Sequence, residues 1–107
     1  MNDSKICKDA VSAFGIESQK RMAVEECAEL INALMKESRG RVSDDDIITE
    51  IADVQIMMEQ LSQIYGKEKV TRERHRKLCR LKKRILATLS PTLPATRTDK
   101  TDCAGIH

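Results

Sequence analysis

The sequence predicts an all-α protein, and three observations support this fold class. Its 107 residues include only four glycines and two prolines, and both prolines come after residue 90, as expected of long helices. Phe14 and Tyr65 are the only aromatic residues, so the core must consist of Leu, Ile, Val, Met and Ala, which suits helices better than sheets. Apolar residues also recur at helical spacing through several segments.

The length predicts one small domain over residues 1–89. A chain of this size buries only about 60 to 65% of its unfolded surface, so it is marginally stable alone. Together with long apolar stripes, this leads us to expect a homodimer or homotetramer, that is, an oligomeric helical bundle. Residues 90–107 contain both prolines and many small polar residues, and we expect a disordered tail there.

Two helices are expected in the first 40 residues. A short helix over residues 4–14 would use Ile6, Ala10, Val11 and Phe14 as its apolar face and end before Gly15. A longer helix over residues 17–38 would end near Gly40. Its apolar positions follow the helical period and are Ala23, Cys27, Leu30, Ile31 and Leu34.

Two further helices are expected after that glycine. Ser43, followed by three aspartates, is an N-cap for a third helix that ends at Tyr65, before Gly66. Its apolar stripe consists of Ile47, Ile51, Val54, Met58, Leu61 and Tyr65. A fourth helix is expected from Thr71, as N-cap, to residue 89, with an apolar stripe of Leu78, Leu81, Ile85 and Leu89.

The segments VEECAELINA and ITEIADVQIM carry acidic pairs at the same offsets. Counted at about 100° per residue, Glu26 and Glu29 lie on one side of the second stripe, and Glu50 and Asp53 lie on the same side of the third. The short connection makes the two helices antiparallel neighbours. All four carboxylates are therefore expected to converge beside the seam.

Four converging carboxylates repel one another unless a cation lies between them. Oxygen ligands without Cys or His favour magnesium, manganese or calcium over zinc. We therefore predict that Glu26, Glu29, Glu50 and Asp53 bind Mg²⁺, with Mn²⁺ as an alternative. Short E-x-x-E and E-x-x-D patterns are also common on helix surfaces, so each pair taken singly carries little weight.

These residues resemble the MazG-like all-α nucleoside triphosphate pyrophosphohydrolases. The family signature, E-x-x-E followed by E-x-x-D on adjacent antiparallel helices, is matched by Glu26-Cys-Ala-Glu29 and Glu50-Ile-Ala-Asp53, and the similarity covers about residues 14–85. The resemblance implies a four-helix domain over residues 1–89 whose four acids are catalytic and hold Mg²⁺. It also implies cleavage of a (d)NTP to a (d)NMP and pyrophosphate. The general base stays open among these acids and Glu25.

Basic residues concentrate in the fourth helix, with ten Lys and Arg but only two Glu between residues 67 and 84. The resemblance assigns some of them to the substrate phosphates, and the candidates are Lys77, Arg80, Arg84 and Lys36. The alternative is a non-catalytic dimerisation module that binds nucleic acid through this helix. We do not expect a nucleic-acid partner, because converging carboxylates weaken binding to a polyanion.

The remaining expectations concern location, cysteines and base recognition. There is no apolar run of signal-peptide or membrane-span length, so we expect a cytoplasmic protein without a membrane partner. The four cysteines form no C-x-x-C pair and are expected to be reduced. Phe14 and Tyr65 could stack on a base, but we assign both to the core, which leaves the preferred nucleotide open.

Overall fold

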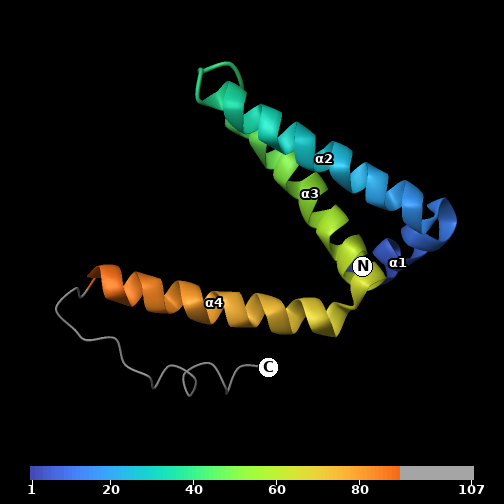
Figure 1. Cartoon of the computed structure of the whole chain (residues 1–107). Helices are drawn as coiled ribbons and strands as arrows, with labels where there is room; N and C mark the ends of the chain where they lie inside the picture. Colours follow the sequence, from blue (N-terminus) through green and yellow to red (C-terminus); the bar gives the residue numbers. More distant parts are fainter. Residues whose placement is uncertain (90–107) are drawn as a thin grey trace. The chain divides into compact units, whose positions relative to one another are not determined.

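The structure, a computed structural model, describes residues 1–89 as four helices, and no strand occurs in this range. The predicted all-α class is confirmed. The helices are α1 (Asp3–Phe14), α2 (Ile16–Glu37), α3 (Asp44–Tyr65) and α4 (Lys67–Leu89) (Figure 1). They divide into a first unit, Met1–Tyr65, and a second unit that begins at Gly66 and contains α4. The expected tail lies outside the described residues.

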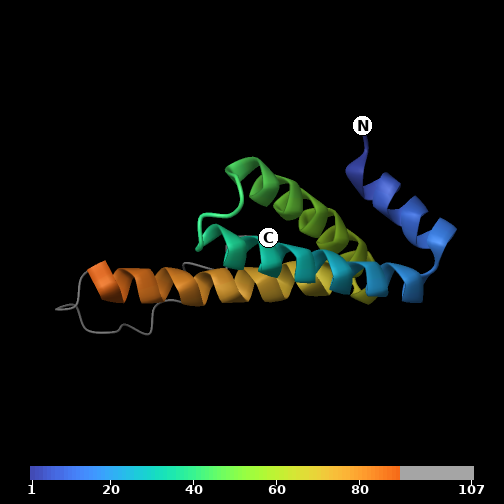
Figure 2. The same ribbon diagram turned by 90° about the horizontal axis from the view of Figure 1, so that it is seen from above.

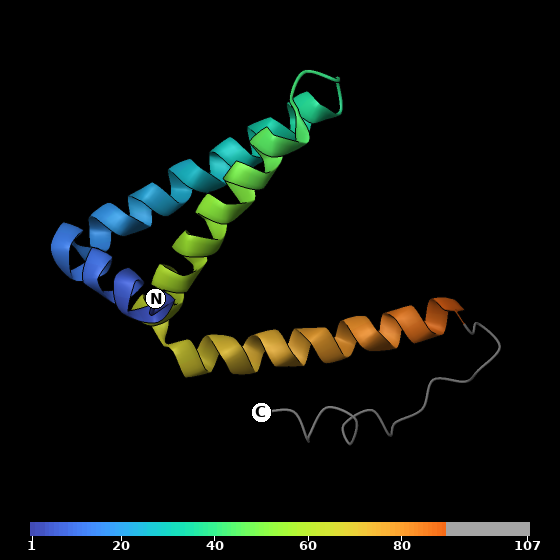
Figure 3. The same ribbon diagram turned by 180° about the vertical axis from the view of Figure 1, so that it is seen from behind.

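The first unit is built around α2 and α3, which form its most extensive helix–helix contact. Each has 22 residues, and the short connection after Glu37 makes them run in opposite directions. Figures 1 and 3 show the two helices side by side with this connection at one end. Each helix is therefore about 33 Å long, at 1.5 Å per residue.

The N-terminus of α3 is capped as the sequence predicts. The Asp46 backbone N–H donates to the Ser43 hydroxyl over 3.3 Å, and the Ser43 backbone N–H donates to the Asp46 carboxylate over 3.2 Å. Such reciprocal bonds satisfy N–H groups that have no partner inside the helix. Asp44, Asp45 and Asp46 in the first turn add negative charge where the helix dipole favours it.

Gly15 separates α1 from α2. Its φ of +94° is in a region that side chains disfavour, and its N–H donates to the Val11 carbonyl at the end of α1. Its own carbonyl accepts from the Gln19 N–H in the first turn of α2. One glycine thus ends one helix and begins the next, and Figure 2 shows the sharp turn between them.

The predicted start of α4 is wrong. The helix begins at Lys67, four residues before the expected N-cap at Thr71. Gly66, with φ of +117°, ends α3, and its carbonyl accepts the Val70 N–H over 3.0 Å, which starts α4 at once. The intervening residues include no helix breaker, and Glu68 suits the positive end of the helix dipole.

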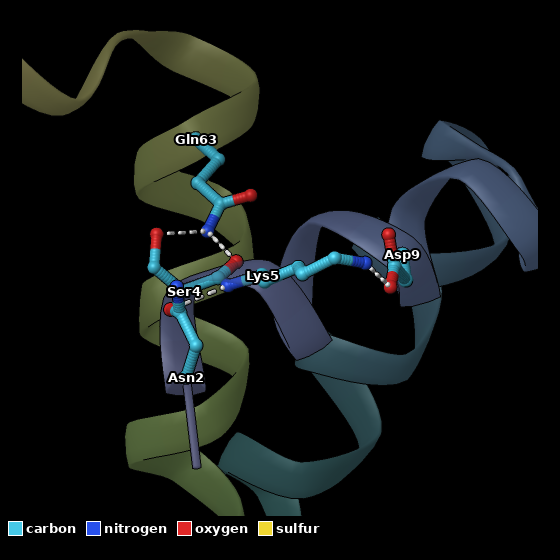
Figure 4. Close-up of polar contacts among 5 residues, drawn as sticks. All are labelled: Asn2, Ser4, Lys5, Asp9 and Gln63. Carbon is cyan, nitrogen blue, oxygen red and sulfur yellow. Dashed lines mark hydrogen bonds and ion pairs between the residues drawn. The ribbon is translucent and has the colours of Figure 1, made fainter.

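Helix α1 packs against both α2 and α3. The Gln63 side-chain amide on α3 donates to the Ser4 carbonyl over 2.9 Å, close to the N-cap that Asn2 provides for α1 (Figure 4). Cys7 is buried beside the Ile56 carbonyl. The face predicted for this helix is only partly right, because Ala10 and Val11 are half-buried while Ile6 and Phe14 are exposed.

The buried apolar core is small. Among the described residues it comprises five side chains, and none of these is fully buried; they are Cys7, Ala23, Ala33, Ile47 and Met57. Gln19 and Gln60 are buried with them. No described helix is long and apolar enough to cross a membrane. Cys7 and Cys27 are free thiols, as expected.

Removing the cap of α3 should weaken the fold. Ser43→Ala deletes the hydroxyl that accepts from Asp46, and we expect a loss of about 1 kcal/mol in the free energy of unfolding. Thr71→Ala is the matched control, since Thr71 lies inside α4 and should give no loss. Urea denaturation followed by circular dichroism measures both. An equal loss in the two variants would contradict the assignment of the cap.

Candidate functional site

Three of the four predicted acids converge between α2 and α3. Carboxylate oxygens of Glu26, Glu29 and Glu50 lie within 4.8 Å of one another. Glu26 and Glu50 are half-buried and Glu29 is exposed, so the cluster opens to solvent on one side. Asp53, also half-buried, lies one helical turn beyond Glu50 on α3. It is outside the set of three, although its charge acts on both Glu26 and Glu50.

Glu26 and Glu50 lie within the contact between α2 and α3, not at its edge. On α2, Glu26 falls between Ala23 and Leu30 in a row of residues that are buried or half-buried. On α3, Glu50 falls between Ile47 and Val54 in the equivalent row. The spacing of three and four residues places each acid on the same helical face as its neighbours in the row. Packing of the helices therefore removes part of both carboxylates from water.

Burial and like charge both raise the pKa of the two half-buried acids. For Glu26, loss of water raises the pKa above its ordinary value most strongly, followed by the negative charges of Glu29 and Asp53. For Glu50, loss of water again dominates, followed by the charges of Glu29 and Asp53. Both effects disfavour the ionised form, so the cluster binds positive charge or protons more readily than separate carboxylates would.

The cluster also contains oxygens that lack hydrogen bonds. Glu26 Oε2 and Glu50 Oε2 are buried and have no donor among the described residues. Across the same residues, no Lys or Arg forms an ion pair with any of the four acids. A buried carboxylate oxygen without a partner is costly. Protons or a bound cation would offset this cost.

A hard divalent cation fits the chemistry of this donor set. Carboxylate oxygens are the ligands that Mg²⁺ and Ca²⁺ prefer in proteins. Octahedral ligands about 2.1 Å from Mg²⁺ lie roughly 3 to 4.2 Å from one another, so small side-chain movements bring these oxygens to that spacing. Glu26, Glu29 and Glu50 are the residues that could hold such an ion directly, and Asp53 is a further acid one helical turn beyond Glu50.

The predicted phosphate-binding residues lie elsewhere on the chain. Lys36 is exposed in the last turn of α2. Lys77, Arg80 and Arg84 are exposed on α4, in the second unit, where spacings of three and four residues place them on one face. Arg76 lies on the same helix and is paired with Glu73. Contact of these cations with substrate stays a prediction.

Both aromatic side chains are exposed, which overturns their assignment to the core. Phe14 is 66% exposed and Tyr65 is 59% exposed. The Lys20 ammonium lies 5.4 Å from the centre of the Tyr65 ring, where a cation interacts favourably with an aromatic face. The assignment of both rings to the core fails because other side chains form the core of the first unit.

One buried polar residue between α2 and α3 was not predicted from the sequence. Gln60 is only 4% exposed, and its Oε1 has no donor within the described part of the chain. It lies seven residues after Asp53, that is, about two helical turns along the same face. This spacing from the E-x-x-D pair is the signal that would have identified it.

Comparisons with known proteins give no assignment, because no family model matches the chain and neither curated proteins nor solved structures yield a match. The carboxylate cluster is therefore the feature that indicates a function.

The raised pKa values of Glu26 and Glu50 predict a pH-dependent stability in metal-free buffer. The folded protein holds protons on these groups more tightly than the unfolded chain does, so their stabilisation is present at low pH. It is lost as the pH rises above 4.5, the ordinary glutamate value, and through the raised pKa of the folded state. Differential scanning calorimetry in EDTA should show Tm falling over this range.

The matched control is the double variant Glu26→Gln, Glu50→Gln. It lacks both titrating groups, and its Tm should fall less steeply with pH. Identical slopes for the variant and the parent chain would show that these carboxyls are not perturbed.

Proposed function

We propose that this protein is a Mg²⁺-dependent nucleoside triphosphate pyrophosphohydrolase of the MazG-like all-α type. The observation that carries the proposal is the carboxylate cluster, in which Glu26, Glu29 and Glu50 lie within 4.8 Å of one another. Two buried oxygens in it have no donor among the described residues. Neighbouring half-buried carboxylates are costly unless protons or a cation neutralise them, and a bound cation is the neutralisation that this proposal supplies.

The reaction is hydrolysis between the α and β phosphates. Water attacks the α phosphorus, the bond to the bridging oxygen breaks, and the products are a nucleoside monophosphate and pyrophosphate. Such chemistry depends mainly on positioning and on neutralising the charge that develops on the phosphate oxygens. Bound Mg²⁺ supplies positive charge and makes its water more acidic. The chain supplies Glu26, Glu29, Glu50 and Asp53 to hold it and to orient that water.

Mg²⁺ is the preferred ion, with Mn²⁺ as an acceptable substitute. Three acids and a nearby fourth offer few direct protein ligands, and Mg²⁺ commonly keeps several waters and binds substrate phosphates beside a few carboxylates. The exposed side of the cluster, at Glu29, leaves room for those phosphates. Candidate cations for the phosphates are Lys77, Arg80, Arg84 and Lys36, and the general base is one of the four acids or Glu25.

The proposal includes self-association as a homodimer or homotetramer and a cytoplasmic location. Self-association is supported by the small core, because five buried apolar side chains are few for a unit of this size. A screen of common and modified nucleoside triphosphates for pyrophosphate release would identify the preferred substrate.

Loss of the acids should abolish the reaction without unfolding the protein. We expect Glu50→Gln and Asp53→Asn each to lower pyrophosphate release at least about 100-fold, because each removes charge that holds the ion. Helical content, measured by circular dichroism, should persist. Glu37→Gln, an exposed acid at the end of α2, is the control and should keep full activity. Hydrolysis at the parent rate by Glu50→Gln would refute the site.

A second candidate function is nucleic-acid binding through α4, in a chain without catalytic activity. The positive charge of α4 favours this function, because the helix carries ten basic residues and only two acidic ones, Glu68 and Glu73. This function predicts salt-sensitive binding of DNA or RNA that is unaffected by Mg²⁺ and weakened in Lys82→Ala, Lys83→Ala. Fluorescence anisotropy with labelled oligonucleotides tests it. Binding that does not weaken in this variant would exclude the candidate.

A further inference from the structure

We infer that two buried glutamines, Gln19 on α2 and Gln60 on α3, bind the base of the nucleotide substrate. We call these two residues the amide pair. The group that they bind is the edge of a base, where an N–H donor lies beside an acceptor. The inference rests on the proposed hydrolysis of nucleoside triphosphates, and it names the residues that recognise the base.

The amide pair is buried where a small helical core normally holds apolar side chains. Gln19 is 6% exposed and Gln60 is 4% exposed, and no other polar residue in the range 1–89 is as fully buried. Gln60 Oε1 has no hydrogen-bond donor within this range. A buried amide oxygen without a donor costs free energy, so its presence calls for an explanation. A ligand that supplies an N–H group to this oxygen is such an explanation.

Equal spacing along the sequence separates each amide from one of the acids. Gln19 precedes Glu26 by seven residues, and Gln60 follows Asp53 by seven residues. At this spacing each amide lies about 20° from its acid around the helix and about 10 Å farther along the axis. Because α2 and α3 are antiparallel, both steps lead away from the connection between the helices. The acids and the amide pair therefore occupy two levels of the same helix pair.

Helix α1 lies at the level of the amide pair. The Gln63 amide donates to the Ser4 carbonyl over 2.9 Å (Figure 4), and Cys7 Sγ lies 3.9 Å from the Ile56 carbonyl oxygen. Ile56, Gln60 and Gln63 share one face of α3, because they are four and three residues apart. Figures 1 and 3 show α1 against α2 and α3 at the end opposite their connection. Helix α1 therefore covers Gln60.

Access of a base to Gln60 requires α1 to move aside, and Gly15 permits this movement. This glycine alone joins α1 to α2, and no described atom outside its immediate neighbours lies within 4 Å of the position that a side-chain carbon would take there. Hinges of this kind consist of a few residues that absorb the change in backbone angles. Rotation at Gly15 moves α1 as a unit and uncovers the amide pair.

The separation between the acids and the amide pair matches the length of a nucleotide. About nine covalent bonds join the α phosphorus to the hydrogen-bonding edge of a base, and an extended chain gains about 1.1 Å per bond, so the two lie about 10 Å apart. A nucleotide whose α phosphate lies at the carboxylates therefore places its base edge at the amide pair. Its sugar lies about half as far away and falls between the two levels.

The carboxamide group suits the recognition of a base. It presents an acceptor oxygen and donor hydrogens in one plane. Glutamine uses this arrangement to form two hydrogen bonds with a base edge in protein–DNA complexes. Because Gln60 Oε1 is already removed from water, a substrate without a base leaves it unpaired. A site of this kind strongly rejects such an analogue.

Two substrates distinguish contact with the base from a structural role of the amide pair. Ribose 5-triphosphate has the sugar and the three phosphates of a nucleotide but no base. We expect the parent chain to favour its preferred nucleoside triphosphate over ribose 5-triphosphate at least about 100-fold in kcat/KM for pyrophosphate release. Gln60→Leu and Gln19→Leu should each lower this ratio at least about 10-fold. Gln55→Leu, which changes an exposed glutamine of α3, is the matched control and should keep the parent ratio.

A second measurement does not depend on catalysis. Isothermal titration calorimetry with AMP, GMP, CMP and UMP, in the presence of Mg²⁺, gives the Kd of each nucleoside monophosphate. Gln60→Leu should raise the Kd of the monophosphate that binds tightest to the parent chain at least about 10-fold. Ribose 5-phosphate is the control ligand, and its Kd should change much less. Circular dichroism shows whether each variant keeps its helices, and Gln19→Leu replaces Gln60→Leu if the latter does not fold.

The outcomes separate this inference from the proposed function. An unchanged ratio of the two kcat/KM values in folded Gln60→Leu and Gln19→Leu would refute base recognition by the amide pair and leave the hydrolysis intact. Failure of the parent chain to release pyrophosphate from any nucleotide would refute the proposed function. In that case the calorimetry decides: absence of nucleotide binding by the parent chain, or an unchanged Kd in the variants, would refute the inference as well.

Discussion

The first unit depends on one constraint, which is the placement of carboxylates inside a helix–helix seam. Glu26 and Glu50 occupy positions where a helical pair usually buries apolar side chains, and both lose water as α2 and α3 meet. Such a seam is stable only if protons or a cation compensate for the lost hydration. The fold and the proposed chemistry are thus linked, because the ion that would neutralise the seam is also the ion that would bind the substrate phosphates.

The same constraint explains the exposed apolar surface. If the helices met along the centres of their apolar stripes, the acids would lie at the border, in water. They meet instead along rows that contain the acids, and Ile31 and Ile51 remain exposed on the other flank. A carboxylate cluster on one side and an exposed apolar surface on the other are therefore two consequences of one rotation of the helices. The small core of the first unit follows from it as well.

Much of the helical framework could be predicted from sequence because its signals are local. Gly15 and Gly66 adopt positive φ values at helix ends, and Ser43 caps α3 through bonds to a residue three positions away. The prediction of Thr71 as an N-cap fails for a local reason too, because the helix-forming residues before Thr71 allow α4 to begin at Lys67. The prediction that Tyr65 lies in the core is wrong for a different reason. Helical spacing identifies an apolar stripe, but it does not show how much of that stripe a neighbouring helix covers.

The sequence by itself determined the four helices, the antiparallel order of α2 and α3, and the convergence of Glu26, Glu29 and Glu50, because these follow from residue spacing and a short connection. Only the tertiary structure decided how far each helix is rotated about its axis. That rotation leaves Glu26 Oε2 and Glu50 Oε2 without donors among residues 1–89, buries Gln60 and exposes Ile31. It depends on the packing of many side chains at once, and a repeat of 100° per residue does not contain that information.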